Sequence, residues 1–131
     1  MLDSPLAMTE TQKVQALIDD WHALRERHAL TSVALERALE SEHELGVSEY
    51  EVLERLAEDT CRMQRLCGLV HLSQSALSRV VGRLESAGLV ERAICPDDRR
   101  GIAARITPAG RERYEAARPT HRRVLEEVLG G

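Results

Sequence analysis

Residues 72–92 read LSQSALSRVVGRLESAGLVER, which is the pattern of an amphipathic helix that runs into a strand. At about 100° per residue, the apolar side chains of this stretch gather on one side of the helix. They are Ala76, Leu77, Val80, Val81, Leu84 and Ala87. Ser73 is a good N-cap for a helix over residues 74–87, and Gly88 ends that helix as a left-handed cap. The stretch therefore predicts one helix face that is buried and an opposite face that is polar.

The polar face of this helix consists of small side chains and hydrogen-bond donors. It carries Ser75, Ser78, Arg79, Gly82 and Ser86, with Gln74 and Arg83 beside them and no acid before Glu85. Surface helices usually mix both signs of charge, whereas an acid here would repel phosphate. Small side chains let a helix sit deep in the major groove, where Gln and Arg reach base edges. We therefore expect a helix that reads DNA; the alternative is a solvated face that happens to lack acids.

The elements on either side of this helix predict a winged helix-turn-helix. Residues 62–69 form a helix ahead of a tight turn, and residues 89–94 and 102–106 are aliphatic runs typical of a two-stranded hairpin. Arg99 and Arg100 lie near the hairpin tip, from which guanidinium groups can enter a narrow minor groove. Asp98 can support the wing by holding Arg100 extended. The alternative for this loop is a solvated, charged turn.

Two segments, LSQSALSRVVGRLESAGLVER and DDRRGIAARITPAG, resemble the MarR family of bacterial transcription regulators. The likeness covers residues 40–118, and the second segment matches the family's wing pattern of D-x-R, a strand, then L/I-T-x-x-G. The resemblance implies an obligate homodimer that binds a pseudo-palindromic operator and loses DNA affinity when a small ligand, metal or oxidant engages it. It also implies which residues contact DNA. The candidates are Ser73, Gln74, Ser75, Ser78, Arg79 and Arg83 on the helix, with Arg99 or Arg100 in the adjacent minor groove.

The rest of the chain predicts long helices. Residues 9–43 carry a seam at steps of three and four, which suits packing against another helix in the same chain or in a twin subunit. The seam consists of Val14, Leu17, Trp21, Leu24, His28, Thr31 and Leu35. Gly46 is expected to stop this helix, and Ser48 with Glu51 forms a capping box for a short helix to about residue 59. Thr107 and Pro108 open a last helix, which Pro119 is expected to kink or break.

These elements predict a mainly α fold with a winged helix-turn-helix, a two-stranded wing and long dimerisation helices. We expect one domain over residues 1–131. Its DNA-binding lobe spans residues 48–106, and its dimerisation helices span residues 9–45 and 108–131.

Composition and charge favour a cytoplasmic, α-rich protein that binds nucleic acid. Aromatic residues make up 2% of the chain, and its three cysteines cannot all pair with one another, which fits a reducing compartment. We expect no membrane span and no export, because no run of about 18 apolar residues and no leader pattern is seen. The net charge is −4, yet residues 62–105 hold eight arginines against four acids. Residues 36–59 hold nine acids, so the basic charge is gathered where phosphate binding would need it.

A small-molecule effector site is a further expectation. An aromatic ring, imidazoles and a guanidinium on or beside the first helix can hold an aromatic carboxylate. These side chains are Trp21, His22, Arg25, His28 and His43. The alternative is that they are interface residues.

The cysteines give weaker candidates. Cys95 stands beside basic residues at the base of the wing, where an exposed thiol can sense oxidants. Cys61, Cys67 and His71 fall short of the four ligands of a structural zinc site, and Cys67 lies on the apolar side of its helix. We expect no metal and no cofactor.

Two other function classes are alternatives to a ligand-responsive, homodimeric repressor. A winged helix can also bind protein, here through the acidic residues 36–59. Retardation of DNA by the isolated protein distinguishes the DNA-binding repressor from such a protein-binding module. The sequence has no G-x-S-x-G elbow, no phosphate-binding loop and no H-E-x-x-H helix, so an enzyme is not expected.

Overall fold

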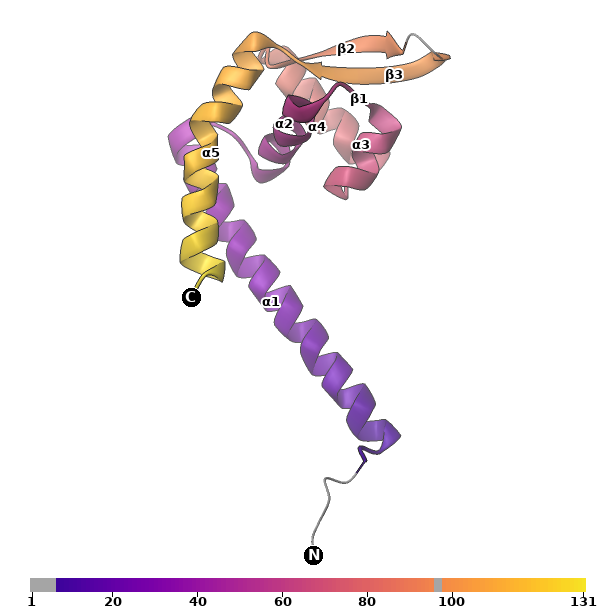
Figure 1. Ribbon diagram of the computed structural model, residues 1–131, viewed down its shortest axis with the longest axis vertical. Helices are drawn as coiled ribbons and strands as arrows, with labels where there is room; N and C mark the ends of the chain where they lie inside the picture. Colours follow the sequence, from indigo (N-terminus) through magenta and orange to yellow (C-terminus); the bar gives the residue numbers. More distant parts are fainter. Residues whose placement is uncertain (1–6, 96–97) are drawn as a thin grey trace, which may run out of the picture.

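The computed structural model describes residues 7–95 and 98–131, with the backbone alone for residues 98–100. Five helices and three strands follow one another in this part of the chain (Figure 1). They are α1 (Glu10–His43), α2 (Val47–Glu58), β1 (Cys61–Arg62), α3 (Met63–Val70), α4 (Gln74–Ser86), β2 (Val90–Cys95), β3 (Asp98–Ile106) and α5 (Pro108–Leu129). The three strands form one antiparallel sheet in the order β1-β3-β2. The expected winged helix-turn-helix, mainly helical with a hairpin wing, is confirmed.

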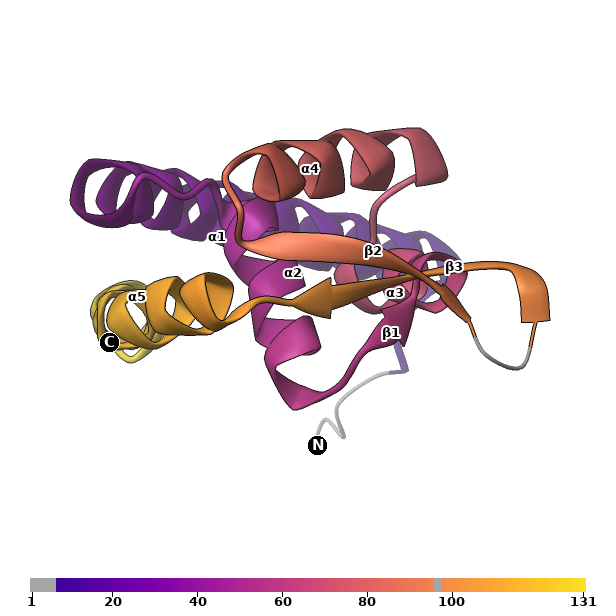
Figure 2. The same cartoon turned by 90° about the horizontal axis from the view of Figure 1, so that it is seen from above.

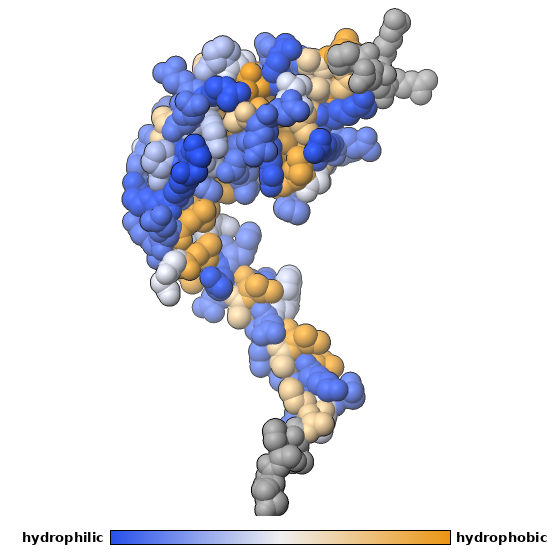
Figure 3. Space-filling view, viewed as in Figure 1, coloured by the Kyte–Doolittle hydropathy of each residue, from blue (hydrophilic) through white to orange (hydrophobic). Residues whose placement is uncertain are grey.

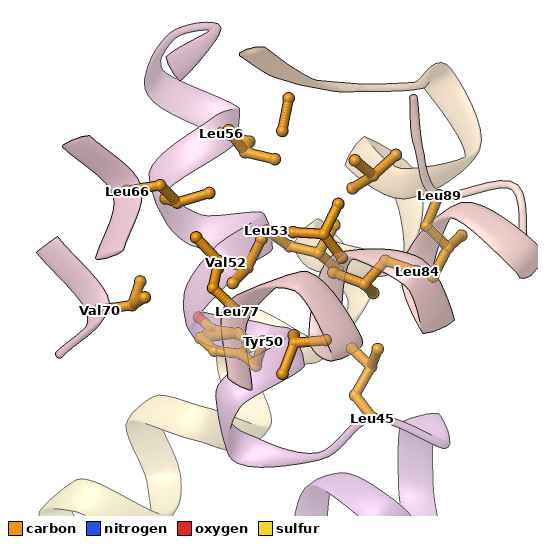
Figure 4. Close-up of a cluster of buried hydrophobic side chains, with 14 of the residues drawn as sticks. Leu45, Tyr50, Val52, Leu53, Leu56, Leu66, Val70, Leu77, Leu84 and Leu89 are labelled. Carbon is orange, nitrogen blue, oxygen red and sulfur yellow. The ribbon is translucent and has the colours of Figure 1, made fainter. Parts of the chain in front are cut away.

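The lobe formed by α2, α3, α4 and the sheet has one apolar core. Leu53 of α2, Leu77 of α4 and Leu66 of α3 are each at most 1% exposed, and Figure 4 shows these side chains pointing toward one another. Each such leucine contributes about 1.5–3 kcal/mol by leaving water. The apolar face predicted for residues 74–87 thus packs inward, which orients the opposite face of α4 toward solvent.

The long helices meet only over part of their length. The C-terminal part of α1 packs along α5, burying Thr31, Leu35 and Leu39. Residues 10–30 are exposed at every position, and Figures 1 and 3 show this half of α1 projecting alone with apolar side chains along it. The exposed large apolar residues on α1 are Val14, Leu17, Ile18, Trp21, Leu24, Leu30 and Val33.

Helix α5 runs unbroken through Pro119. Of the kink or break that we expected at Pro119, the break is wrong, and α5 instead bends along its length (Figure 1). Ala117, Thr120 and Val124 on either side of the proline are buried. We attribute the continuity of α5 to this packing, which outweighs the backbone hydrogen bond that proline cannot donate.

The start of α2 differs from the expected capping box. The helix begins at Val47, two residues before the position predicted from Ser48 and Glu51. Gly46 is its N-cap, and its N–H donates to Glu49 Oε1 at 2.8 Å. Helix α1 ends at His43, with Glu44 in the left-handed region at φ 56°.

The I-T-x-x-G motif fastens α5 to the end of α4. Thr107 caps α5 by accepting from the Gly110 N–H at 3.0 Å, and its hydroxyl donates to the Gly88 carbonyl at 2.7 Å. The Thr107 N–H donates to the Leu89 carbonyl at 3.1 Å. Gly110 is buried directly against that same carbonyl, where a Cβ atom would not fit. The motif is therefore a structural joint between the wing, α4 and α5.

Candidate nucleic-acid interface

Helix α4 presents the predicted polar face to solvent. Ser73 is the N-cap, and its hydroxyl oxygen accepts from the Ala76 N–H at 3.1 Å. The side chains on the open face are all exposed, namely Ser73, Gln74, Ser75, Ser78, Arg79 and Arg83. Leu77, Val80, Val81 and Leu84 on the other face are buried. The face can donate hydrogen bonds over its whole length, and its first acid, Glu85, comes only in the last turn.

Arg83 sits at the edge of this face and has an acidic neighbour. Its Nε lies 3.9 Å from Glu49 Oε2, at the start of α2, while its side chain stays 59% exposed. An exposed pair at this distance contributes little energy. Arg83 therefore remains available to a ligand in front of α4.

Arg92 of β2 is a residue that the sequence reasoning did not select. Its Nη2 donates to the Ser78 carbonyl at 3.4 Å, and its Nε lies 3.3 Å from Glu85 Oε1. The guanidinium thereby connects the base of the wing to α4 at two points, seven residues apart along the helix. Glu91 and Arg92 close the stretch of residues 72–92, and no periodic pattern in that stretch indicates this contact.

The wing residues can be placed only by their backbone. Asp98, Arg99 and Arg100 lie in β3, whose pairing with β2 shifts register between Ile94 and Cys95. The side chains of these three residues lie outside the described part of the structure, so their predicted contacts stay predictions. Figure 2 shows the hairpin running beside α4 and projecting beyond its N-terminal end.

Comparison with known proteins identifies the architecture. A family model for the MarR family matches residues 45–102. The crystal structure of AbsC, a MarR family transcriptional regulator from Streptomyces coelicolor, is 31% identical with a TM-score of 0.76, over 94% of this chain and 81% of AbsC. The chain belongs to the MarR family.

Further relatives agree with this family assignment. Sco3205, a MarR family regulator from Streptomyces coelicolor solved in complex with DNA, is 29% identical with a TM-score of 0.79, over 98% of this chain and 79% of that one. A 60-residue match is 37% identical to the uncharacterized HTH-type transcriptional regulator YdgJ of Bacillus subtilis (strain 168). That match spans 46% of this chain and 37% of YdgJ. The protein is thus a MarR-family transcription regulator, and its class is not that of an enzyme.

Cys95 is a free but buried cysteine in this MarR-family protein. Strand β2 extends one residue beyond its predicted end, so Cys95 pairs with Asp98 in the hairpin and its side chain is 5% exposed. The predicted exposed thiol at the wing base is therefore wrong. Cys61 is also buried, and this burial raises the pKa of its thiol. Burial therefore disfavours the reactive thiolate of Cys61.

Metal-binding side chains do not gather in the part of the chain that the structure describes. No group of three or more His, Cys, Asp or Glu side chains there is arranged to hold a metal ion. Within the same residues, no helix is both long and apolar enough to cross a bilayer.

The five candidate effector residues do not form one site in a protomer of this MarR-family protein. Trp21, Arg25 and His28 line a shallow hollow on the bare half of α1, and the Arg25 guanidinium lies 5.9 Å from the Trp21 ring centroid. His22 is exposed on the same helix. His43 is 22 residues beyond Trp21, which is about 33 Å along a helix. Within one chain, His43 is therefore too far from the other four candidate residues to share a site with them.

His43 instead belongs to a polar cluster that joins α1 to α5. Its Nε2 lies 2.7 Å from Thr120 Oγ1, and the Thr120 hydroxyl donates to Glu42 Oε1 at 3.3 Å. Arg123 Nη2 donates to Glu42 Oε2 at 2.7 Å, and this contact lowers the pKa of Glu42. Arg113 Nη1 donates to the His43 carbonyl at 3.1 Å. The crossing of the two helices is thus fixed by directional contacts as well as by apolar packing.

Proposed function

We propose that this MarR-family regulator binds a specific DNA sequence through α4 and the wing, and that it acts as a homodimeric, ligand-responsive repressor in the cytoplasm. The proposal rests on the contrast between the buried face and the exposed face of α4. Leu77, Val80, Val81 and Leu84 fix the helix in the lobe, and the donor-rich face of Gln74, Ser75, Ser78 and Arg79 is exposed. Small residues with two longer donors suit insertion into the major groove.

The proposed homodimer is supported by the bare half of α1. Leu17, Trp21 and Leu24 are 58–65% exposed on a helix whose residues 10–30 are all exposed. A continuous apolar stripe of this kind marks an interaction surface. A second copy is the natural occupant, because two-fold symmetry places two α4 helices on a pseudo-palindromic operator. Those helices need to lie about 34 Å apart to enter successive major grooves.

The proposed effector response is supported by the same region. The hollow lined by Trp21, Arg25 and His28 has a volume of about 520 Å³ and joins an aromatic ring to cationic and imidazole groups. These groups suit an aromatic carboxylate. A ligand there would change DNA affinity only if it bound one arrangement of the two lobes more tightly than the other.

Selection of bound fragments from the source genome, followed by gel shifts with the recovered duplex, tests the proposal. We expect tight binding to the selected sequence, much weaker binding to a scrambled duplex, and a stoichiometry of two chains per site. Arg79→Ala is expected to cost about 1–3 kcal/mol and to relax the preference at one base position in each half-site. Arg55→Ala, which removes an exposed arginine from α2, is the matched control. If the protein fails to retard the selected duplex, or if both variants lose DNA affinity equally, the exposed face of α4 is not the surface that binds DNA.

A further inference from the structure

Glu49, in the first turn of α2, is a charged neighbour of α4 that the proposed function does not use. Its two carboxylate oxygens face different partners. Oε1 accepts from the Gly46 N–H at 2.8 Å, and Oε2 lies 3.9 Å from Arg83 Nε on α4. The Glu49 side chain is only 19% exposed, whereas that of Arg83 is 59% exposed. Glu49 is therefore held in place, while the long side chain of Arg83 can reorient.

The corner between α1 and α2 fixes the position of the Glu49 carboxylate. A Cβ atom added to Gly46 would lie 3.1 Å from Glu49 Oε1 and 3.0 Å from Glu36 Oε1, so both carboxylates are seated against that glycine. Glu36 Oε2 accepts from the Val47 N–H at 3.3 Å. The N-terminus of α2 also favours a negative charge at this place. These contacts fix one carboxylate charge beside Arg83.

The two ends of the exposed face of α4 have different electrostatic surroundings. Residues 74–79, at the N-terminal end, include no acid. Towards the C-terminal end, Arg83 shares a hollow of about 560 Å³ with four acids of the α1–α2 corner. They are Glu36, Glu40, Glu44 and Glu49. The charge of Arg83 is thus opposed before any DNA arrives, and Glu49 is the acid that forms an ion pair with it.

We propose that Glu49 limits the affinity of this protein for DNA by competing with phosphate for Arg83. This inference rests on the proposed function, in which Arg83 faces DNA. The separation of 3.9 Å is too long for a hydrogen bond, so the pair does little to orient Arg83 and acts mainly through its charge. Exposed ion pairs change an equilibrium by up to about fivefold. Glu49 acts through Arg83 without contacting a base, so it changes the affinity for all sequences alike.

The competition follows from where the two charges lie once a duplex is bound. Arg83 can turn its guanidinium towards a phosphate, but the bond to the Gly46 N–H keeps Glu49 at the start of α2. The phosphate then lies at a distance from Glu49 comparable to the Debye length, which is about 8 Å at physiological salt. The attraction that Arg83 gives up and the repulsion between carboxylate and phosphate both weaken binding. Both effects decrease as salt is added.

Glu49→Gln tests the proposal, because its amide oxygen can still accept from the Gly46 N–H while the charge is removed. We expect this variant to bind the selected operator and a scrambled duplex each about two- to fivefold more tightly than the wild type at low salt. The gain should shrink as salt rises from about 50 to 200 mM. Fluorescence anisotropy of the full chain measures these affinities, and thermal unfolding checks that each variant is folded.

Glu49→Ala separates the loss of the charge from the gain of an amide. It lowers stability by removing the acceptor for the Gly46 N–H, but it should show the same increase in DNA affinity as Glu49→Gln. A gain confined to Glu49→Gln would come from the new amide donor and would overturn the proposal. If one of the two variants does not fold, the other still decides the direction of the effect.

Two further comparisons test whether Glu49 acts through Arg83. In an Arg83→Ala background, Glu49→Gln should bring a markedly smaller gain, because no guanidinium is left for which the carboxylate and phosphate compete. Glu58→Gln is the charge-matched control, since Glu58 is exposed in the last turn of α2, about 14 Å along the helix from Glu49. This control should leave the DNA affinity unchanged.

The outcomes separate this proposal from the proposed function. Unchanged or weaker binding by folded Glu49→Gln or Glu49→Ala, a gain confined to the operator, an equal gain in Glu58→Gln, or a full gain in the Arg83→Ala background overturns the role of Glu49. Each of these results leaves the DNA-binding regulator intact. Absence of any preference for the selected duplex in the wild type overturns both.

Discussion

Gly110, in the first turn of α5, lies against the carbonyl oxygen of Leu89, in the link between α4 and β2, so closely that no side chain fits between them. Thr107 bonds to Gly88 and Leu89 at the same place. The part of the chain that follows α4 is thereby joined directly to α5, the helix that packs on α1.

Gly110→Ala is expected to destabilise the protein by about 1–3 kcal/mol, because its Cβ would displace the Leu89 backbone. The matched control is Gly68→Ala, in the exposed part of α3, where a Cβ meets no atom within 4 Å. That change should stabilise by about 0.5–1 kcal/mol through helix propensity. Urea unfolding of the two variants measures both free energies, and equal effects of the same sign would contradict the packing argument.

His71→Gly is expected to stabilise the protein by about 1 kcal/mol. His71 ends α3 with φ 56°, a left-handed conformation that strains any residue with a Cβ. His71→Ala keeps the Cβ and should bring no such gain. Thermal unfolding of the two variants compares them at one position, and a larger gain from alanine would show that the imidazole rather than the backbone is the source of strain.

Leu17→Glu is expected to weaken self-association at least tenfold. Leu17 is 65% exposed on the bare half of α1, so the substitution leaves the core of the protomer untouched. It buries a charge only if a second chain covers the stripe. Sedimentation over a range of protein concentrations measures the effect, with Leu17→Met as the apolar control. An unchanged dimerisation constant in Leu17→Glu would remove α1 from the interface.

The protein is expected to lose stability between pH 7.5 and pH 5.5 in part through His121. This ring stacks on Tyr50 with centroids 4.3 Å apart, and burial lowers its pKa, while Glu54 opposes that shift. As the pH falls below about 6.5, the unfolded chain takes up a proton that the folded chain resists, so the free energy of unfolding decreases.

His121→Phe keeps a stacked ring that cannot titrate. Its unfolding midpoint should therefore fall less than that of the wild type between the same two pH values. Circular dichroism melts of both proteins at pH 7.5 and 5.5 give the comparison. Identical pH shifts would place the pH dependence in other groups.

The sequence predicted the elements whose signals are local and repeated. Helix α4 carried a periodic apolar face, a serine cap and a terminal glycine, and each appears in the structure within a residue of its expected place. Strand β1 was missed because its two residues, Cys61 and Arg62, are too few to show alternation. The start of α2 was misplaced because Glu49 offers the same capping chemistry two residues before Glu51.

The features that sequence reasoning missed or misjudged depend on contacts between distant segments. Arg92 reaches the Ser78 carbonyl and Glu85 only because the wing folds back along α4. Cys95 is buried at a position where β2 pairs with Asp98 of β3, one residue beyond the predicted end of the strand. Pro119 is tolerated where α5 packs on α1. None of these contacts is encoded in the period or composition of a single stretch.

In the proposed homodimer, the bare half of α1 (residues 10–30) makes folding depend on the concentration of the protein. A helical segment that stands alone in water gains little order from its own propensity, so we expect residues 10–30 to become better ordered when the proposed second copy covers them. When a second copy supplies that cover, ordering of the arm and pairing of the chains become one equilibrium, and the melting temperature rises with protein concentration. For the proposed homodimer, we therefore expect dilution to fray residues 10–30 before the DNA-binding lobe unfolds, so that the protein concentration determines how much of the protein can occupy a two-fold site.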